Sequence, residues 1–230
     1  MPKRYTTPGR GGNKLAESLP IPVTPMDAWG YARTMESWDR LVRALGATAG
    51  ELGLRPPATE TDLVATEVMV GHPLPADYRA WLAIANGQET TGLSILPPGG
   101  WLISHDRLIE QWTHERNFDL EEAEYDGAPI EDHGRVRGFV HHPRRITIGG
   151  WYDLDGDNAM LDLIPGPDGT EGQIMTFVSE CDFEVIGTSF GAYLDRVAAL
   201  VEAGKLTPGM ENDAPKLCTP QGGRWEFLVR

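Results

Sequence analysis

The residues best suited to metal chemistry are the carboxylates of Asp153-Leu154-Asp155-Gly156-Asp157-Asn158. Their alternation matches the first part of the EF-hand calcium-loop pattern, in which oxygen ligands surround the ion. That pattern requires glycine at its sixth position and a bidentate glutamate at its twelfth. Here these positions hold Asn158 and Ile164, so the cage lacks its closing carboxylate. We therefore expect a hairpin turn rather than a calcium site.

The remaining candidates for metal binding or nucleophilic catalysis are His114, His133, His141, His142 and Cys181. The histidine spacing matches no HExxH motif, and adjacent histidines on a strand point to opposite faces. Cys181 has no CxxC partner, and the carboxylates around it disfavour its reactive thiolate. The glycine clusters do not connect a strand to a helix as a phosphate-binding loop would, and no GxSxG is present. We predict no catalytic, cofactor-binding or metal-binding residue, and hence a protein that is not an enzyme.

The distribution of charge is more informative. The 230 residues carry a formal net charge of −14. Residues 113–135 contribute −6 and residues 151–186 contribute −9, whereas residues 1–30 contribute +2. Such an excess of acid disfavours binding to nucleic acid, which needs a cationic face, and attracts basic partners. Two solvated loop faces would account for these segments equally well.

Apolar periodicity predicts the elements that position these segments. Helical spacing begins at Tyr31 and stops at Gly46; a second helix, capped by Thr59, turns Leu63, Val64 and Val68 inward. A third begins at Pro75 and ends at Asn86-Gly87, a fourth is capped by Ser104, and the last starts near Thr188 or Ser189.

Short β-type runs predict an antiparallel meander. The predicted strands are 93–97, 146–148, 160–163, 173–177 and 183–186, and turn residues separate the last four. Helices followed by strands and a closing helix indicate an α+β fold.

Several motifs together resemble the SUKH superfamily, which includes the fungal Smi/Knr cell-wall regulators. Leu74-Pro75-Ala-Asp-Tyr78-Arg-Ala-Trp81-Leu82 followed by Asn86-Gly87 is similar to its "lP.dyr.wl...NG" signature. Asp155-Gly156-Asp157-Asn158 with Leu161-Asp162-Leu163 resembles "dg.gn.l.lDl", and Ser189-Phe190 with Leu194 resembles "SF..fL". The resemblance covers roughly residues 35–205 and is mainly architectural: Trp81 and Trp151 suit a core, and the glycines suit turns.

The resemblance implies an antiparallel sheet packed by helices in a single SUKH-like domain. We expect a flexible extension at 1–30, the domain at 31–205 with an acidic loop at 113–135, and a tail at 206–230 with room for an extra strand. Two cysteines, and a basic start with no apolar run after it, favour a cytoplasmic protein; no apolar run is long enough to span a membrane.

Bacterial members of the superfamily are typically immunity proteins that neutralise a cognate toxin, often a nuclease, and fungal members are scaffolds in cell-wall signalling. We therefore expect a basic protein partner, in particular a toxin domain, with a regulatory scaffold as the alternative. A carboxylate surface would be attracted to the cationic site of a nuclease and could mask it. The predicted contact residues are Glu121, Glu122, Glu124, Tyr125, Asp126, Asp153, Asp155 and Asp157. The oligomeric state and the partner itself stay open.

Overall fold

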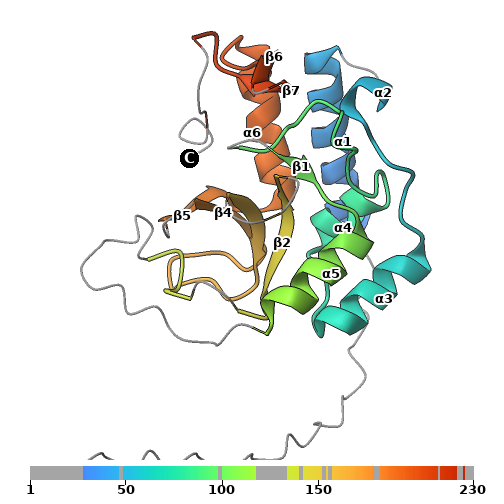
Figure 1. The fold of residues 1–230 in the computed structure, drawn as a ribbon, viewed down its shortest axis with the longest axis vertical. Coiled ribbons are helices and arrows are strands. Elements are labelled where there is room, and N and C mark those ends of the chain that lie inside the picture. The colour runs from blue at the N-terminus through green and yellow to red at the C-terminus, as the bar shows by residue number, and fades with distance from the viewer. Residues whose placement is uncertain are drawn as a thin grey trace, which may run out of the picture.

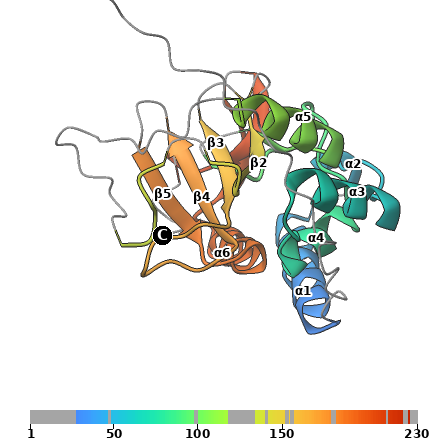
Figure 2. The same ribbon diagram turned by 90° about the horizontal axis from the view of Figure 1, so that it is seen from below.

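The computed structural model of the protein describes residues 28–46, 49–97, 100–117, 134–139, 142–151, 154, 157–178, 182–211, 213–221 and 225. Within these ranges the chain forms an antiparallel sheet with helices packed beside and beneath it (Figures 1 and 2). The helices are α1 (Ala28–Leu45), α2 (Ala49–Leu52), α3 (Glu60–Val70), α4 (Ala76–Leu82), α5 (His105–Glu115) and α6 (Phe190–Glu202). The strands are β1 (Trp101–Leu102), β2 (Arg145–Gly150), β3 (Asn158–Asp162), β4 (Gln173–Val178), β5 (Asp182–Gly187), β6 (Thr207–Glu211) and β7 (Ala214–Cys218). The α+β architecture predicted from the sequence is confirmed.

The sheet is a simple meander in the order β1-β2-β3-β4-β5, with every neighbouring pair antiparallel. The four predicted strands from residue 146 onward are confirmed; three are longer than predicted, and the strand predicted at 160–163 runs from Asn158 to Asp162. The predicted strand at 93–97 is wrong. Ser94 donates its N–H to the Pro215 carbonyl and accepts from the Leu217 N–H, so this segment bridges to β7 instead of joining the sheet. The edge position beside β2 is taken by β1.

The helix caps follow the sequence closely. Thr59 forms a full capping box with Asp62, and Ser104 and Ser189 accept hydrogen bonds from the first turns of α5 and α6. The predicted end of α4 is wrong, because the helix stops at Leu82 rather than at Asn86. After Leu82 the backbone continues in hydrogen-bonded turns, and the side-chain oxygen of Asn86 accepts a hydrogen bond from the His105 N–H. Asn86 therefore connects two elements rather than ending one.

Aromatic rings form the centre of the main core, between the helices and one face of the sheet. The Trp38 and Trp81 rings pack edge to face with centroids 4.4 Å apart, and Phe190 of α6 lies 5.9 Å from Trp81. Tyr78 contacts the same Phe190 ring at 5.2 Å. Because these rings come from α1, α4 and α6, their burial holds the three helices together. Val68, predicted to face inward, is 66% exposed on α3.

The opposite face of the sheet is covered by a strap, residues 134–139. A buried guanidinium, that of Arg145, donates to the backbone carbonyls of Arg137 and Phe139. Gln173 donates to the carbonyl of Arg135 and to the Asp162 carboxylate, which lies 3.5 Å from Arg145. Burial lowers the pKa of Arg145, and the Asp162 carboxylate opposes this effect. The strap is thus attached to the sheet through buried polar groups.

The core continues past residue 205. Leu206, Leu217 and Trp225 are buried with the helical residues of the main core. The hairpin of β6 and β7, which contributes Leu217 to this core, was not predicted from the sequence, because prolines at 208 and 215 obscure its strand pattern. Within the described part of the chain, no helix is long and apolar enough to cross a membrane.

Candidate functional site

A hollow of about 240 Å³ opens where the helical half of the molecule meets the sheet. Three sets of residues form it: residues 88–90 with Arg55, residues 101–104 with Arg107, and Gly150, Trp151 and Leu154. Its apolar wall consists of Trp101, Leu102, Trp151 and Leu154. We call it the tryptophan hollow.

Two tryptophans on adjacent chain segments define the apolar wall. The Trp101 and Trp151 rings stand nearly perpendicular, with centroids 5.8 Å apart at 87°. Trp101 is buried, and its indole N–H donates to the Gly92 carbonyl at 2.7 Å. Trp151, assigned to the core from the sequence, is instead half-buried and lines the hollow. Trp151 directly follows β2, and part of its ring is exposed at the hollow.

Leu154 lies in the wall with an unusual backbone. Its φ is +55°, in the left-handed region that residues with a side chain rarely adopt. Its N–H donates to the Trp151 carbonyl at 3.0 Å, and its carbonyl accepts from the Asn158 side-chain amide at 2.8 Å. Asn158 is buried, and its own side-chain oxygen has no hydrogen-bond partner. The strained leucine is thus held against the hollow by a buried asparagine.

Close backbone approach explains a glycine at the base of this site. Gly87 has a φ of +80°, and a Cβ there would lie 2.6 Å from the carbonyl carbon of Ile103. The neighbouring Gln88 is buried and donates its amide to the carbonyls of Leu52 and Leu93. The Gln88 N–H also donates to the Leu102 carbonyl at 2.7 Å. These bonds fix the floor of the hollow, and no local motif predicts them because most of their partners are distant in sequence.

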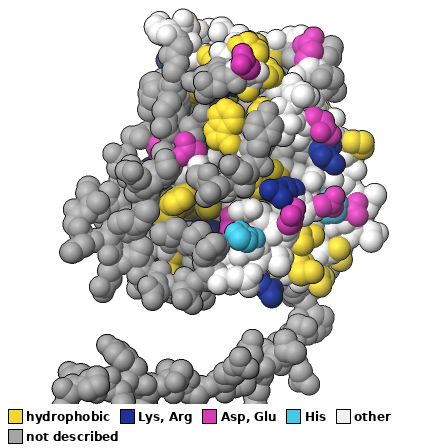
Figure 3. Space-filling view, in the orientation of Figure 1, with side chains coloured by type: hydrophobic (Ala, Val, Ile, Leu, Met, Phe, Trp, Pro, Cys, Tyr) yellow, Lys and Arg dark blue, Asp and Glu magenta, His cyan; other side chains and the backbone are white. Residues whose placement is uncertain are grey.

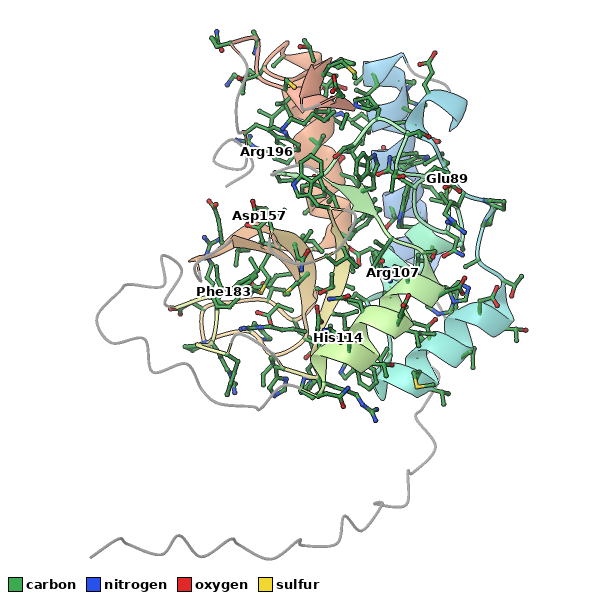
Figure 4. All side chains as sticks on the ribbon, in the orientation of Figure 1. Glu89, Arg107, His114, Asp157, Phe183 and Arg196 are labelled. Carbon is green, nitrogen blue, oxygen red and sulfur yellow. The ribbon has the colours of Figure 1, made fainter. Side chains whose placement is uncertain are left out.

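Charged side chains surround the opening. Arg55 lies 3.6 Å from Glu89, and Arg107 lies 2.7 Å from Glu110 one helical turn away. The side chains of these arginines are 41% and 38% exposed, so solvent screens both pairs. Figure 4 places Glu89 and Arg107 on the helical half of the molecule and Asp157 on the sheet half. The helical half thus offers paired charges of both signs at the opening, and Asp157 adds a carboxylate on the sheet half.

Of the predicted contact residues, the described ranges contain only Asp157. It is half-exposed at the start of β3, and its carbonyl oxygen is 3.2 Å from where a Cβ on Gly150 would lie, beside the hollow. The other seven lie outside the described residues: Glu121, Glu122, Glu124, Tyr125, Asp126, Asp153 and Asp155.

Some acidic residues of the two predicted acidic segments are buried in the structure. Asp162 is fully buried in its pair with Arg145, and Glu184 is only 7% exposed. Glu115 is partly buried and accepts from the Thr147 hydroxyl at 2.7 Å. On the face drawn in Figure 3, acidic and basic side chains alternate over the helical half instead of forming one patch. Net charge in a sequence window therefore overstates the surface charge that the window presents.

Only two of the histidines considered as metal ligands, His114 and His142, are among the residues that the structure describes. His142 accepts a hydrogen bond from the Arg144 N–H, and burial, with the charge of Arg145 next in importance, lowers its pKa. His114 lies on α5, while His133, His141 and Cys181 fall outside the described residues. Among the described residues, no three His, Cys, Asp or Glu side chains are close enough to hold a metal.

Comparison with known proteins agrees with this geometry. The sequence profile of the SMI1 / KNR4 family (SUKH-1) matches residues 57–196, which include α3 to α5, the first half of α6, the five-stranded sheet and every lining residue of the tryptophan hollow except Arg55. The chain belongs to the SMI1/KNR4 family. The family assignment made from the motifs, and the SUKH-like fold that it implied, are therefore confirmed.

A relative from this family is the cell wall biosynthesis/cell cycle regulator smi1 of Schizosaccharomyces pombe, which is 29% identical to this chain. The alignment covers 92% of this chain but 42% of the fission-yeast protein. The chain thus spans less than half the length of this relative, and the similarity extends beyond the segment matched by the family profile.

Proposed function

We propose that this SMI1/KNR4-family chain is a non-enzymatic protein-binding module whose partner docks over the tryptophan hollow. The observation that carries the proposal is the composition of the hollow. Half-buried Trp151, buried Trp101 and two exposed arginines lie around one opening. Tryptophan and arginine are the residue types in which interface energy concentrates, because they combine large apolar area with directed polar groups.

The volume of the hollow supports a protein ligand over a small cofactor. Sites for drug-sized ligands usually measure about 300–1,000 Å³, whereas this hollow measures about 240 Å³. A hollow of this size suits one or two side chains of a partner whose remaining surface lies outside it.

For the partner, we propose a basic toxin domain that this chain neutralises as an immunity protein. The net charge of −14 supports a cationic partner, because long-range attraction accelerates association with one. The proposed contacts are the acidic residues Glu121, Glu122, Glu124 and Asp126, with Tyr125 as an anchor, and the residues Asp153, Asp155 and Asp157, of which Asp157 lies beside the hollow.

The experiment first identifies a gene beside this one that encodes a secreted protein with a toxin-like C-terminal domain, and then tests that domain by co-expression and gel filtration of the complex. We expect growth to be rescued, and the complex to weaken as salt is added. Trp151→Ala should weaken the complex, whereas Lys205→Glu, an exposed change on the loop after α6, should not. No rescue and no complex at low salt would remove the immunity proposal.

A second candidate is a regulatory scaffold, supported by the similarity to the fission-yeast regulator. A scaffold would bind several proteins with weaker dependence on salt. Affinity purification from the native host separates the two functions. One tightly bound toxin domain supports immunity, and several cell-wall or signalling proteins lost together in Trp151→Ala support the scaffold.

A further inference from the structure

We propose that the segment entering the tryptophan hollow carries an apolar side chain followed by carboxylates. This inference rests on the proposed protein-binding function and adds the chemistry of the bound segment. It concerns only that segment, and a partner that is basic as a whole can still present it.

The apolar requirement follows from which polar groups around the hollow are already used. The Gln88 amide donates to two carbonyls, and the Trp101 indole N–H donates to a third. The Ser104 hydroxyl accepts from the Arg107 N–H as the cap of α5. What remains on the inner wall is chiefly the half-buried ring of Trp151, with a small exposed part of Leu154, and this surface favours an aliphatic or aromatic side chain.

The carboxylate requirement follows from the charged residues that line the opening. Among the lining residues, Arg55 and Arg107 contribute two positive charges and Glu89 one negative charge, while Glu110, the partner of Arg107, lies outside the lining. Each arginine forms a solvent-exposed ion pair with a glutamate, and such a pair is weak enough for a ligand carboxylate to replace the glutamate. A carboxylate beside the apolar side chain can accept from either guanidinium, whereas a lysine there could pair only with Glu89 among the lining residues.

The strained wall indicates a prearranged site. Leu154 keeps a left-handed backbone because Asn158 and Trp151 hold both of its backbone polar groups. Strain of this kind persists only where the surroundings impose it, and it is frequent at ligand sites. A wall already in its bound shape avoids the ordering cost that weakens binding of short segments.

The test uses the full chain and three synthetic peptides, observed through the tryptophan indole N–H signals in NMR spectra. The peptides are acetyl-Gly-Phe-Glu-Glu-Gly-amide, the same peptide with both glutamates replaced by lysine, and the same peptide with phenylalanine replaced by alanine. Trp101→Phe and Trp151→Phe assign the two signals.

We expect the Phe-Glu-Glu peptide, at millimolar concentration, to shift the Trp151 signal most. The lysine and alanine peptides should bind about tenfold more weakly or not at all. Replacing Arg55 and Arg107 together by glutamate should reverse the preference between the glutamate and lysine peptides. The charge reversal Lys205→Glu, outside the lining of the hollow, should leave the preference as it is.

The proposal is overturned if the lysine peptide binds the unmodified chain as well as the glutamate peptide, or if no peptide shifts either tryptophan. Its failure is distinguishable from failure of the protein-binding function. If Trp151→Ala breaks the partner complex while the peptides show no preference, docking at the hollow stands and the acidic segment is rejected. If Trp151→Ala leaves the partner complex unchanged, docking at the hollow itself is rejected.

Discussion

Replacing Asp162 by asparagine tests whether the buried pair with Arg145 holds the strap on the sheet. The side chains of Arg145 and Asp162 are 1% and 0% exposed, and the guanidinium Nε lies 3.5 Å from the carboxylate. Asparagine keeps the shape but removes the negative charge, so Arg145 remains buried without its counter-ion. Removing one partner of a buried pair costs about 3–5 kcal/mol.

The other contacts of Arg145 and Asp162 decide where in this range the loss falls. Arg145 keeps its bonds to the strap carbonyls of residues 137 and 139, and its guanidinium lies 5.0 Å from the Phe183 ring centre. These contacts retain part of the stabilisation of the cation. The Gln173 amide, however, loses its charged acceptor on Asp162. We therefore expect a loss in the lower half of the range, about 3–4 kcal/mol.

The assay is equilibrium unfolding in urea, followed by tryptophan fluorescence and far-UV circular dichroism. The matched control is Asp195→Asn, the same chemical change at an ion pair with Arg40 in which both side chains are more than a third exposed. The control should change the free energy of unfolding little, since exposed pairs contribute little. The reasoning is refuted if Asp162→Asn loses no more stability than Asp195→Asn.

Three further predictions concern single positions. Burial raises the pKa of Glu115, so its contribution to stability is full below the pKa of the unfolded state and is lost as pH rises through the pKa of the folded state. The hydrogen bond from Arg40 lowers the pKa of Glu202, so the contribution of Glu202 is lost as pH falls through the pKa of the folded state. Urea unfolding of Glu115→Gln and Glu202→Gln from about pH 4 to about pH 7 should give differences from the unmodified chain with opposite slopes, and parallel slopes would contradict the assignment. Gly87→Ala should unfold at a lower temperature than Gly46→Ala. Both positions need a positive φ, which costs alanine about 1–2 kcal/mol, but of the two only a Cβ at Gly87 would meet backbone atoms. Equal losses of stability would show that the backbone around Gly87 relaxes to accept the Cβ. Thr59→Ala should cost about 1 kcal/mol through loss of the capping box, measured by the urea midpoint, and no change would mean that water replaces the cap.

Local chemistry explains which elements were predictable. The Thr59 box and the Ser104 and Ser189 caps act within three residues, so the sequence predicts them directly. The strands of the meander were likewise found from β-type runs between turns. The predictions that failed depend on partners distant in sequence. The 93–97 segment pairs with residues near 216, and α4 ends where Asn86 meets His105.

The candidate site was only partly predictable for the same reason. The acidic hairpin around Asp157 was found from composition, whereas the hollow beside it joins Arg55, Trp101 and Trp151 across almost a hundred residues. Asp162 and Glu184 show the converse, since both counted as surface acids by sequence and are buried in the fold. Charge can be counted along a chain, but exposure depends on what packs over it.

The sequence by itself determined the family, the α+β class, the caps and the acid excess, because motifs, periodicity and composition are properties of neighbouring residues. The tertiary structure alone decided that Trp151 lines a hollow, that Asn158 holds Leu154 in a strained conformation, and that Arg145 and Asp162 attach the strap to the sheet. These features require residues from separate elements to meet at distances of a few ångströms. Burial and strain arise only from that meeting, since packing sets the solvent exposure and the backbone geometry of each residue.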